Sequence, residues 1–519
     1  MITTDGVAMG GFNRGLGTVV TAVAVAVVAA GCNDETGGDA ATSPTAKPSA
    51  QGVVAVDGAP LRTHYMSWPG KSFKVDLLGL DQVAPARVVA RFRVTAGPGS
   101  AVAPTVWAAP AHSGDHAPSG ALLLDSGHAT EYPVLRTQSG ACLCTELNDV
   151  KAGQQVDLDA VFPAPAGGAG KMIVVFPNTP PFLDVPITAH APYVLHQRQG
   201  GTPLNPVTTP TATPESYPLV TTVRHGDETD ATGGGKTSVR LSSDVLFATN
   251  SAKLTGKAQS LLKQVSAKIE KSPGTTVAVD GYADNTGTDA VNLPLSKKRA
   301  ENVRAALRTL VKRQGIQYSA AGHGSADPIA DNGKPAGRAL NRRVVITFAA
   351  LAQASQDKRP LPAAGADPAG QPDAPAVASV HAGKGPIPLL PWPKSMTFGV
   401  TGLIRQPNGF AVLTWTLHNV NRHPIPAGFA TDLADVFRNA GPGRIVLGVG
   451  QDEYKNVTDT RQQAVFPGYS LRQGDYVVRA QGSLAGWNMF RLPAGVRTVT
   501  VRVPGFPAVP NVPVQASKS

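Results

Sequence analysis

The stretch "GYADNTGTDAVNLPLSKKRA", residues 281–300, places a carboxylate in a turn-rich loop and a guanidinium at the start of a helical pattern. The carboxylate is Asp284, and the guanidinium is Arg299, fifteen positions later. Ser296 is a residue type typical of a helix N-cap, so Arg299 is expected in the first turn. A cation there opposes the helix dipole at a cost of about 0.3 to 1 kcal/mol. A nearby anion should compensate it, and residue types alone favour pairing with Asp284 or Asp289.

The sequence on both sides of this stretch alternates between strand and helix periodicity. "VRLSSDVLF" reads as a strand, and apolar residues then recur every three or four positions from Leu254 to Ile269. "TTVAVDGY" follows as a strand, a second amphipathic helix runs from Ser296 to near Gly315, and "YSAAGHG" and "RRVVITF" supply two more strands. The order β-α-β-α-β-β predicts an α+β domain, a mixed sheet with both helices on one face.

This block resembles the OmpA-like peptidoglycan-binding domain of outer-membrane proteins, peptidoglycan-associated lipoproteins and flagellar stators. The residues at family spacing are Gly281, Asp284, Gly287, Asn292, Leu295, Ser296, Arg299, Ala300, Gly322, Gly324, Pro328, Ala330, Gly337, Arg338, Asn341, Arg342 and Arg343. The resemblance implies that Asp284 holds the ammonium, and Arg299 the carboxylate, of the free end of diaminopimelate in the peptide stem.

Four other residues of the loop bear on that site. Thr286 and Asn292 are expected as loop or ligand contacts, although Asn292 can equally cap backbone donors without binding a ligand. Tyr282 and Ala283 stand where the family usually has His and Thr. The loss of that Thr hydroxyl puts wall affinity in question more than the identity of the site.

The N-terminus is typical of an exported protein. An uncharged run from Leu16 to Ala30 follows Arg14 and ends at Gly31 and Cys32, which predicts a signal peptide over 1–31. The small residues before the cysteine resemble a bacterial lipoprotein site, so Cys32 is the expected attachment point for a lipid such as palmitate. An ordinarily cleaved signal and an uncleaved, slightly short anchor remain alternatives. All three place the chain in the cell envelope, without indicating which membrane.

Composition divides the remainder of the chain. Residues 32–52 lack apolar periodicity and read as a flexible tether. Segments rich in Pro, Gly and Thr predict linkers over 199–237 and 351–388. Between the linkers lie blocks at 53–198 and 389–515, on either side of the OmpA-like block at 238–350.

The two outer blocks resemble each other. "WPGKSFKVDLLGL" from Trp68 matches "WPKSMTFGVTGL" from Trp392, and "VVFPNTPPFLDVPI" matches "VRVPGFPAVPNVPV". Each block has β-branched, alternating runs between turn clusters and no convincing amphipathic helix. They are therefore predicted to be repeated all-β, sandwich-like modules, giving a multidomain chain with a central α+β domain.

The polar residues of the outer blocks form no recognisable catalytic motif. Their histidines lie at no signature spacing from a nucleophile and carboxylate, and no cofactor motif is present. Cys142 and Cys144 are read as a local disulfide or buried thiols. A metal site is disfavoured because a third and fourth ligand are lacking. No nucleic-acid fold signature and no porin-like series of strands is found.

Charge is concentrated in the middle block. Residues 238–350 contain 17 Lys and Arg against 8 Asp and Glu, most of the net +11 of the whole chain, which favours anionic wall polymers at low salt. Two hypotheses follow. The chain is a non-catalytic tether, held to a membrane by lipid and to peptidoglycan by Asp284 and Arg299, with β modules that recruit envelope proteins. Alternatively, a β module is an envelope enzyme or sensor that the OmpA-like domain targets to the wall.

Overall fold

A computed structural model describes most of the chain beyond its N-terminal segment. The described residues are 59–68, 71–168, 170–189, 205–351, 376–381, 396–423, 445–463, 465, 480–503 and 506–516. The predicted signal peptide, the tether and Cys32 lie outside them. Among the described residues, no helix has the length and apolar content to cross a membrane.

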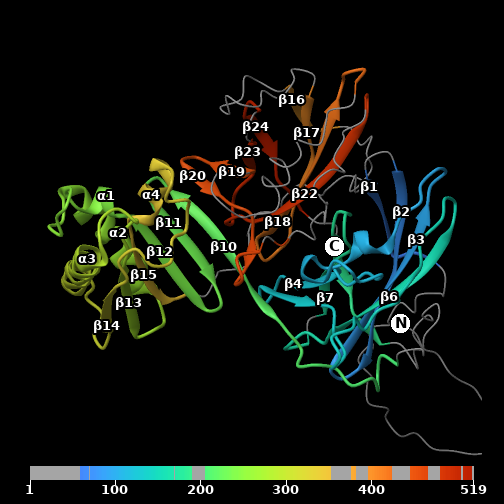
Figure 1. Ribbon diagram of the computed structural model, residues 1–519, viewed down its shortest axis with the longest axis horizontal. Helices are drawn as coiled ribbons and strands as arrows, with labels where there is room; N and C mark the ends of the chain where they lie inside the picture. Colours follow the sequence, from blue (N-terminus) through green and yellow to red (C-terminus); the bar gives the residue numbers. More distant parts are fainter. Residues whose placement is uncertain are drawn as a thin grey trace, which may run out of the picture. The chain divides into compact units, whose positions relative to one another are not determined.

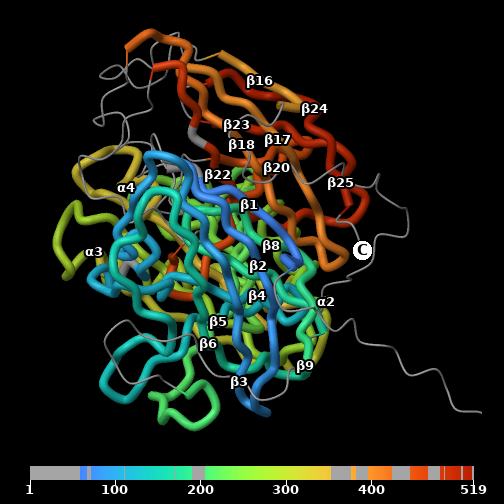
Figure 2. Tube along the Cα trace, turned by 90° about the vertical axis from the view of Figure 1, so that its right-hand side faces the viewer, coloured from blue at the N-terminus to red at the C-terminus, as the bar shows by residue number. Residues whose placement is uncertain are grey.

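The first β module contains two sheets around one core. Its first sheet has the order β1-β2-β3-β6, with β9 pairing parallel to β2; the bounds are Arg62–Trp68, Lys71–Ala84, Arg87–Ala96, Gln155–Pro163 and Thr188–Ala189. The second has the order β5-β4-β7-β8, with bounds Thr130–Pro133, Leu122–Asp125, Lys171–Val175 and Phe182–Pro186. Phe73, Phe92 and Phe182 meet in a core drawn from both sheets. Figure 2 shows β1, β2 and β3 running together.

The last β module repeats that topology. Its first sheet has the order β16-β17-β18-β22, with β25 pairing parallel to β17; the bounds are Ala378–His381, Met396–Arg405, Phe410–Asn419, Ser483–Arg491 and Gln515–Ala516. The second sheet has the order β20-β19-β23-β24, with bounds Asp452–Tyr454, Val446–Val449, Thr498–Arg502 and Val509–Pro513. Strand for strand, the connectivity equals that of the first module.

The middle block is an α+β unit with a mixed sheet. Its elements are β12 (Lys236–Ser242), α1 (Ser243–Leu246), α2 (Gly256–Lys271), β13 (Thr276–Gly281), α3 (Asp289–Leu310), β14 (Gln317–Gly322), α4 (Pro335–Asn341) and β15 (Arg343–Ala349). β13 pairs parallel with β14 and antiparallel with β15. Helices α2 and α3 cover one face of this sheet (Figure 1), where Leu262 and Val303 share a core with strand residues such as Ile346. The short helices α1 and α4 were not expected.

The start of α3 differs from the sequence-based prediction. The helix begins at Asp289, with Thr288 at the N-cap, so Arg299 lies in the middle of the helix and the dipole argument does not apply. Pro294 lies inside the helix, where it lacks an N–H for the helical ladder. Ser296, the expected N-cap, accepts a hydrogen bond from the backbone of Gly324 through Oγ at 3.0 Å.

Much of the predicted linker over 199–237 is folded in this structure. Residues Tyr217–His225 form β10 and Glu228–Gly233 form β11, joined by a turn in which Gly226 has φ +62°. β11 pairs with β12 and so extends the sheet of the middle block. The alternating run "YPLVTTVRH" is strand-forming, and the surrounding Thr, Pro and Gly obscured it.

The linker predicted over 351–388 also contains a strand among its described residues. β16 lies within that range and pairs antiparallel with β17 in the sheet of the last module. Its four residues, "ASVH", form a short strand next to Gly- and Pro-rich sequence. The prediction followed the linker-like composition of the flanking residues and missed the weak strand pattern.

β10 also contacts both β modules. Its first residues pair with β5, the middle pairs with β21 (Thr458–Asp459), and its end pairs with β20. An apolar cluster adds to these backbone contacts: Leu124 and Ile173 of the first module pack with Phe410 and Trp487 of the last. Trp487 Nε1 donates to the carbonyl of Thr179 at 2.8 Å.

Two glycines let α3 lie directly on the sheet. A Cβ at Gly281 would lie 2.2 Å from the carbonyl oxygen of Ser296, and one at Gly322 would lie 2.2 Å from the backbone nitrogen of Lys297. Both contacts are with helix backbone, which has no flexible end to move aside. The ends of β13 and β14 therefore require glycine where α3 crosses them.

We predict that Gly281→Ala destabilises the middle block by about 1 to 3 kcal/mol, the usual range for overpacking. Urea unfolding of the full chain, with hydrogen exchange in peptides covering β13 and α3, measures the effect. Gly256→Ala at the start of α2 is the matched control, because its added Cβ would meet nothing within 4 Å. Equal protection in the two variants would contradict the packing role of Gly281.

Candidate functional site

Asp284 lies in the loop between β13 and α3, with its side chain buried. The residue is 3% exposed. Its Oδ1 accepts hydrogen bonds from the backbone nitrogen of Thr286 at 2.8 Å and from the Thr286 hydroxyl. The backbone nitrogen of Ala283 donates to the carbonyl of Gly324 at 2.7 Å, which ties this loop to the segment after β14. The carboxylate is therefore held in a fixed position.

Asn292 stabilises the same loop from the first turns of α3. Its Nδ2 donates to the carbonyl of Thr286 at 3.0 Å and to that of Asp284 at 3.4 Å. Asn292 therefore donates hydrogen bonds to backbone carbonyls. The sequence had suggested that it would instead accept them from backbone N–H groups. Thr286 directs both of its donors at Asp284. Ligand contacts by Asn292 and Thr286 remain predictions.

The partner of Asp284 is Arg342, directly after α4. Arg342 Nη1 pairs with Asp284 Oδ2. The same guanidinium forms a bidentate pair with Asp244, at 2.8 Å from Nε and 2.6 Å from Nη2. The sequence-based preference for an Arg299 pair with Asp284 or Asp289 is therefore wrong. Arg342 stood at family spacing, but no sequence signal marked its partners, which lie 58 and 98 positions away.

Arg299 lies within electrostatic reach of Asp244 and Arg342 but has no carboxylate partner among the described residues. It is 8% exposed, its Nε donates to the carbonyl of Ser251 at 2.9 Å, and its guanidinium lies 5.2 Å from the ring centroid of Phe247. No described residue accepts a hydrogen bond from Nη1 or Nη2. A buried guanidinium with unused donors is a natural site for an anionic group.

The charges of the cluster influence one another. Burial lowers the pKa of Arg299, Asp244 opposes that shift and Arg342 adds to it. Burial alone would raise the pKa of Asp284, but hydrogen bonds from Thr286 and the pairing with Arg342 outweigh it and lower the pKa. Asp284 is therefore ionised at neutral pH. The cluster offers a fixed carboxylate and an unpaired guanidinium, which suits a small group carrying both charges.

Tyr282, which replaces the family's His, lies in a stack beside the loop. Its ring stacks on His323 with centroids 4.7 Å apart, and the guanidinium of Arg343 lies 3.7 Å from the Tyr282 centroid. His323 Nε2 contacts Asp280 Oδ1 at 2.9 Å. The Tyr282 ring is thus held in place directly after β13, two positions before Asp284.

The cysteine pair lies in the first β module, away from these residues in sequence. Cys142 and Cys144 form a disulfide, and both are buried. In the described part of the chain, no group of three or more His, Cys, Asp or Glu residues is arranged to hold a metal ion.

We predict that Arg342→Ala raises the pKa of Asp284, because it removes a charged donor while the Thr286 donors stay. The folded pKa lies below the unfolded value of about 3.9, so this carboxylate stabilises the fold above that value. The stabilisation is lost as pH falls through the folded pKa. An NMR titration of the Asp284 carboxyl carbon measures the shift. Arg308→Ala, at an exposed position of α3, should leave it unchanged; an unshifted Arg342→Ala titration would refute the pairing.

Comparisons with known proteins concern the middle block. Residues 246–342 match the model of the OmpA family. The peptidoglycan-binding protein ArfA of Mycobacterium tuberculosis is 39% identical over 104 residues, which are 20% of this chain and 31% of ArfA. The probable lipoprotein YiaD of Escherichia coli is 37% identical over 121 residues, 23% of this chain and 53% of YiaD.

A solved structure matches the same part. The peptidoglycan-associated lipoprotein from Burkholderia pseudomallei is 32% identical, with a TM-score of 0.18, over 20% of this chain and 88% of that one. The match of residues 246–342 to the family model shows that this chain contains an OmpA-like domain. It spans about half of YiaD and less than a third of ArfA.

Proposed function

Because residues 246–342 are an OmpA-like domain, we propose that this domain binds peptidoglycan through the free end of diaminopimelate in a stem peptide. One observation carries the proposal: Arg299 is a buried guanidinium with two unused nitrogens. It interacts electrostatically with Arg342, which pairs with the fixed carboxylate of Asp284. ArfA, which is similar over this region, is a peptidoglycan-binding protein. The block also carries an excess of Lys and Arg.

The end group of diaminopimelate matches the charges of the cluster. Its carboxylate would accept hydrogen bonds from Nη1 and Nη2 of Arg299, whose planar fork suits two oxygens. Its ammonium would pair with Asp284 Oδ2 in place of Arg342 Nη1, which pairs with that oxygen in this structure. Arg342 would keep its bidentate pair with Asp244. Binding would thus exchange one ion pair for another and leave no buried charge alone.

The remainder of the chain suits a tether. We propose that export and lipid attachment at Cys32 hold the N-terminus at a membrane of the cell envelope, while the OmpA-like domain holds the wall. Two weak anchors at one interface reinforce each other through effective concentration. The similarity to a probable lipoprotein, YiaD, supports this arrangement. The β modules would recruit envelope proteins.

We further propose that the chain is not an enzyme. The relatives of the OmpA-like domain are named for binding or for the envelope, and none of them for a reaction. In the described residues of the β modules, no serine, histidine and carboxylate form a hydrogen-bonded series. This favours tethering over the alternative of an enzyme targeted to the wall.

We predict that Asp284→Ala and Arg299→Ala each weaken binding to diaminopimelate-type peptidoglycan about tenfold to a hundredfold. The reason is that each removes a charged hydrogen bond of about 1.5 to 3 kcal/mol. Co-sedimentation of the full chain with purified wall at moderate salt measures this, with free diaminopimelate as competitor. Arg299→Lys should also bind poorly, because an ammonium lacks the planar fork.

Arg308→Ala is the matched control, since it removes one positive charge from an exposed position of the same helix. Its binding should remain close to wild type. Equal loss in Arg308→Ala and Arg299→Ala would mean that only basic surface charge attracts the wall. The supernatants should contain no released muropeptides; their appearance would favour the enzyme alternative.

We predict that Cys32→Ala abolishes incorporation of labelled palmitate and releases the protein from the membrane fraction. A thioether or thioester to lipid needs the cysteine sulfur, and Ala offers none. Metabolic labelling followed by fractionation gives the readout. Cys142→Ala with Cys144→Ala is the control, because these sulfurs already form a disulfide. Persistent labelling of Cys32→Ala would exclude this lipid anchor.

A further inference from the structure

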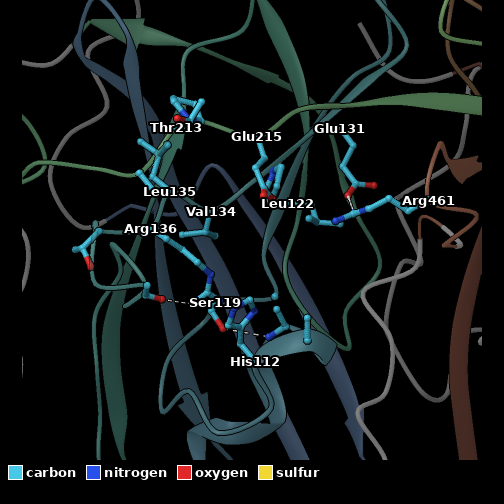
Figure 3. Close-up of a pocket in the computed structure, with 18 of the residues that line it drawn as sticks. His112, Ser119, Leu122, Glu131, Val134, Leu135, Arg136, Thr213, Glu215 and Arg461 are labelled. Atoms are coloured by element: carbon cyan, nitrogen blue, oxygen red, sulfur yellow. Dashed lines mark hydrogen bonds and ion pairs between the residues drawn. The ribbon is translucent and has the colours of Figure 1, made fainter.

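A cavity lies far from the proposed wall site in sequence, between the first β module, the segment before β10 and the segment after β21. Its volume is about 340 Å³, within the usual size range of small-molecule sites. Apolar walls come from Leu122, Pro133, Val134 and Leu135. Figure 3 shows Glu131, Glu215 and Arg461 at one end, and His112, Ser119 and Arg136 at the other.

At the end of the cavity that contains Glu131, carboxylates outnumber positively charged side chains. Glu131 is 3% exposed, and its Oε1 accepts from Arg461 Nη2 at 3.1 Å. The same guanidinium pairs with Asp459, which is 1% exposed, at 2.5 Å, and lies over the ring of Tyr217. One arginine thus serves two buried carboxylates. No described residue donates to the second oxygen of Glu131.

Glu215 adds a third carboxylate at the rim. It is exposed, and it accepts a hydrogen bond from the Tyr217 hydroxyl at 2.5 Å. At the opposite end, Arg136 is already occupied: Nη2 pairs with Asp115 at 2.9 Å and Nη1 donates to the carbonyl of Gly140 at 2.8 Å. An anionic ligand would find no unpaired arginine here, whereas a cation would find unused carboxylate oxygens.

The geometry points to a binding site for a small organic cation: we propose that this cavity takes a primary amine attached to an apolar body. The amine would donate to the second oxygen of Glu131 and to Glu215, and the body would lie against Leu122, Pro133 and Leu135. This site is independent of the wall site proposed above. Its ligand class differs from an anionic polymer, since both arginines already pair with carboxylates.

The repeated module supplies an internal comparison. β5 and β20 are equivalent strands, both pair with β10, and both contain a Glu–Tyr pair. Glu453 of β20 pairs with Arg224 at 2.5 Å and with Arg502 at 3.8 Å, and it lines no part of the cavity. The equivalent carboxylate is therefore fully paired in one repeat and only half used in the other.

Protonation of Glu131 makes binding sensitive to pH. Burial, together with the negative charge of Asp459, raises the pKa of Glu131 to about 7, and Arg461 opposes this shift. Glu215 is the other titratable group lining this end of the cavity besides Glu131, Asp459 and Arg461, and Tyr217 donates a hydrogen bond to it. An amine needs the ionised form, so its affinity should rise as pH rises through 7.

Benzylamine, benzyl alcohol and benzoate test the proposal, because they share one ring and differ in charge. Ligand-observed NMR titrations with the full chain should show benzylamine binding more tightly than the other two. The affinity for benzylamine should increase about tenfold from pH 6 to pH 8, following the ionised fraction of a group with a pKa of about 7. Absence of benzylamine binding at 10 mM, or equal binding of all three, overturns the proposal.

Variants assign the effect to the cavity. Glu131→Gln should weaken benzylamine binding at least about tenfold, as expected for a lost charged hydrogen bond, and should abolish its pH dependence. Glu215→Gln, at the exposed rim, should weaken it less without disturbing the buried cluster. Glu453→Gln is the matched control and should bind as wild type does. A wild-type pH profile in Glu131→Gln would overturn the assignment, even if Glu215→Gln weakens binding.

Discussion

The pairing of β10 is the interaction on which the architecture depends. One strand of nine residues forms backbone hydrogen bonds with β11, β5, β21 and β20. It thereby joins the sheet of the OmpA-like domain to strands of both β modules. An unpaired strand edge is exposed to wrong partners, and β10 covers the edges of two sheets at once. A force applied at the proposed wall site would pass to the β modules through a continuous hydrogen-bonded ladder.

The repeat explains why one strand can serve both modules. Each module leaves an equivalent edge strand, β5 or β20, at the end of its second sheet. β10 pairs with β5 through Tyr217 and Pro218 and with β20 through Val223, Arg224 and His225. The two modules have diverged at their contacts with β10. The carboxylate of Glu453 pairs with two arginines. The carboxylate of Glu131 is buried and shares a single arginine, Arg461, with Asp459.

Local patterns in the sequence predicted the helices and strands of the middle domain well. They could not predict pairs between residues that are distant in sequence. The apolar stripe of α2 and the residues at family spacing located the mixed sheet and its helices. The start of α3 was missed because Pro294 and Ser296 resemble a helix boundary, although the first turn forms before them. β10 was missed because the Thr, Pro and Gly around its strand-forming residues indicated a linker. The pairing of Asp284 with Arg342 joins residues 58 positions apart, which no local spacing reveals.

The roles of the two arginines follow from what each one already holds. Arg342 is bound to two carboxylates, so losing Asp284 to a ligand would leave it the bidentate pair with Asp244. Arg299 holds only a backbone carbonyl through Nε, and its outer nitrogens face no described acceptor. The side chain of Arg342 is 31% exposed, and the pair with Asp244 leaves it a charged partner with or without ligand. In the proposed site, Asp244, which no sequence motif singled out, would therefore allow Asp284 to change partners while Arg299 takes an anion.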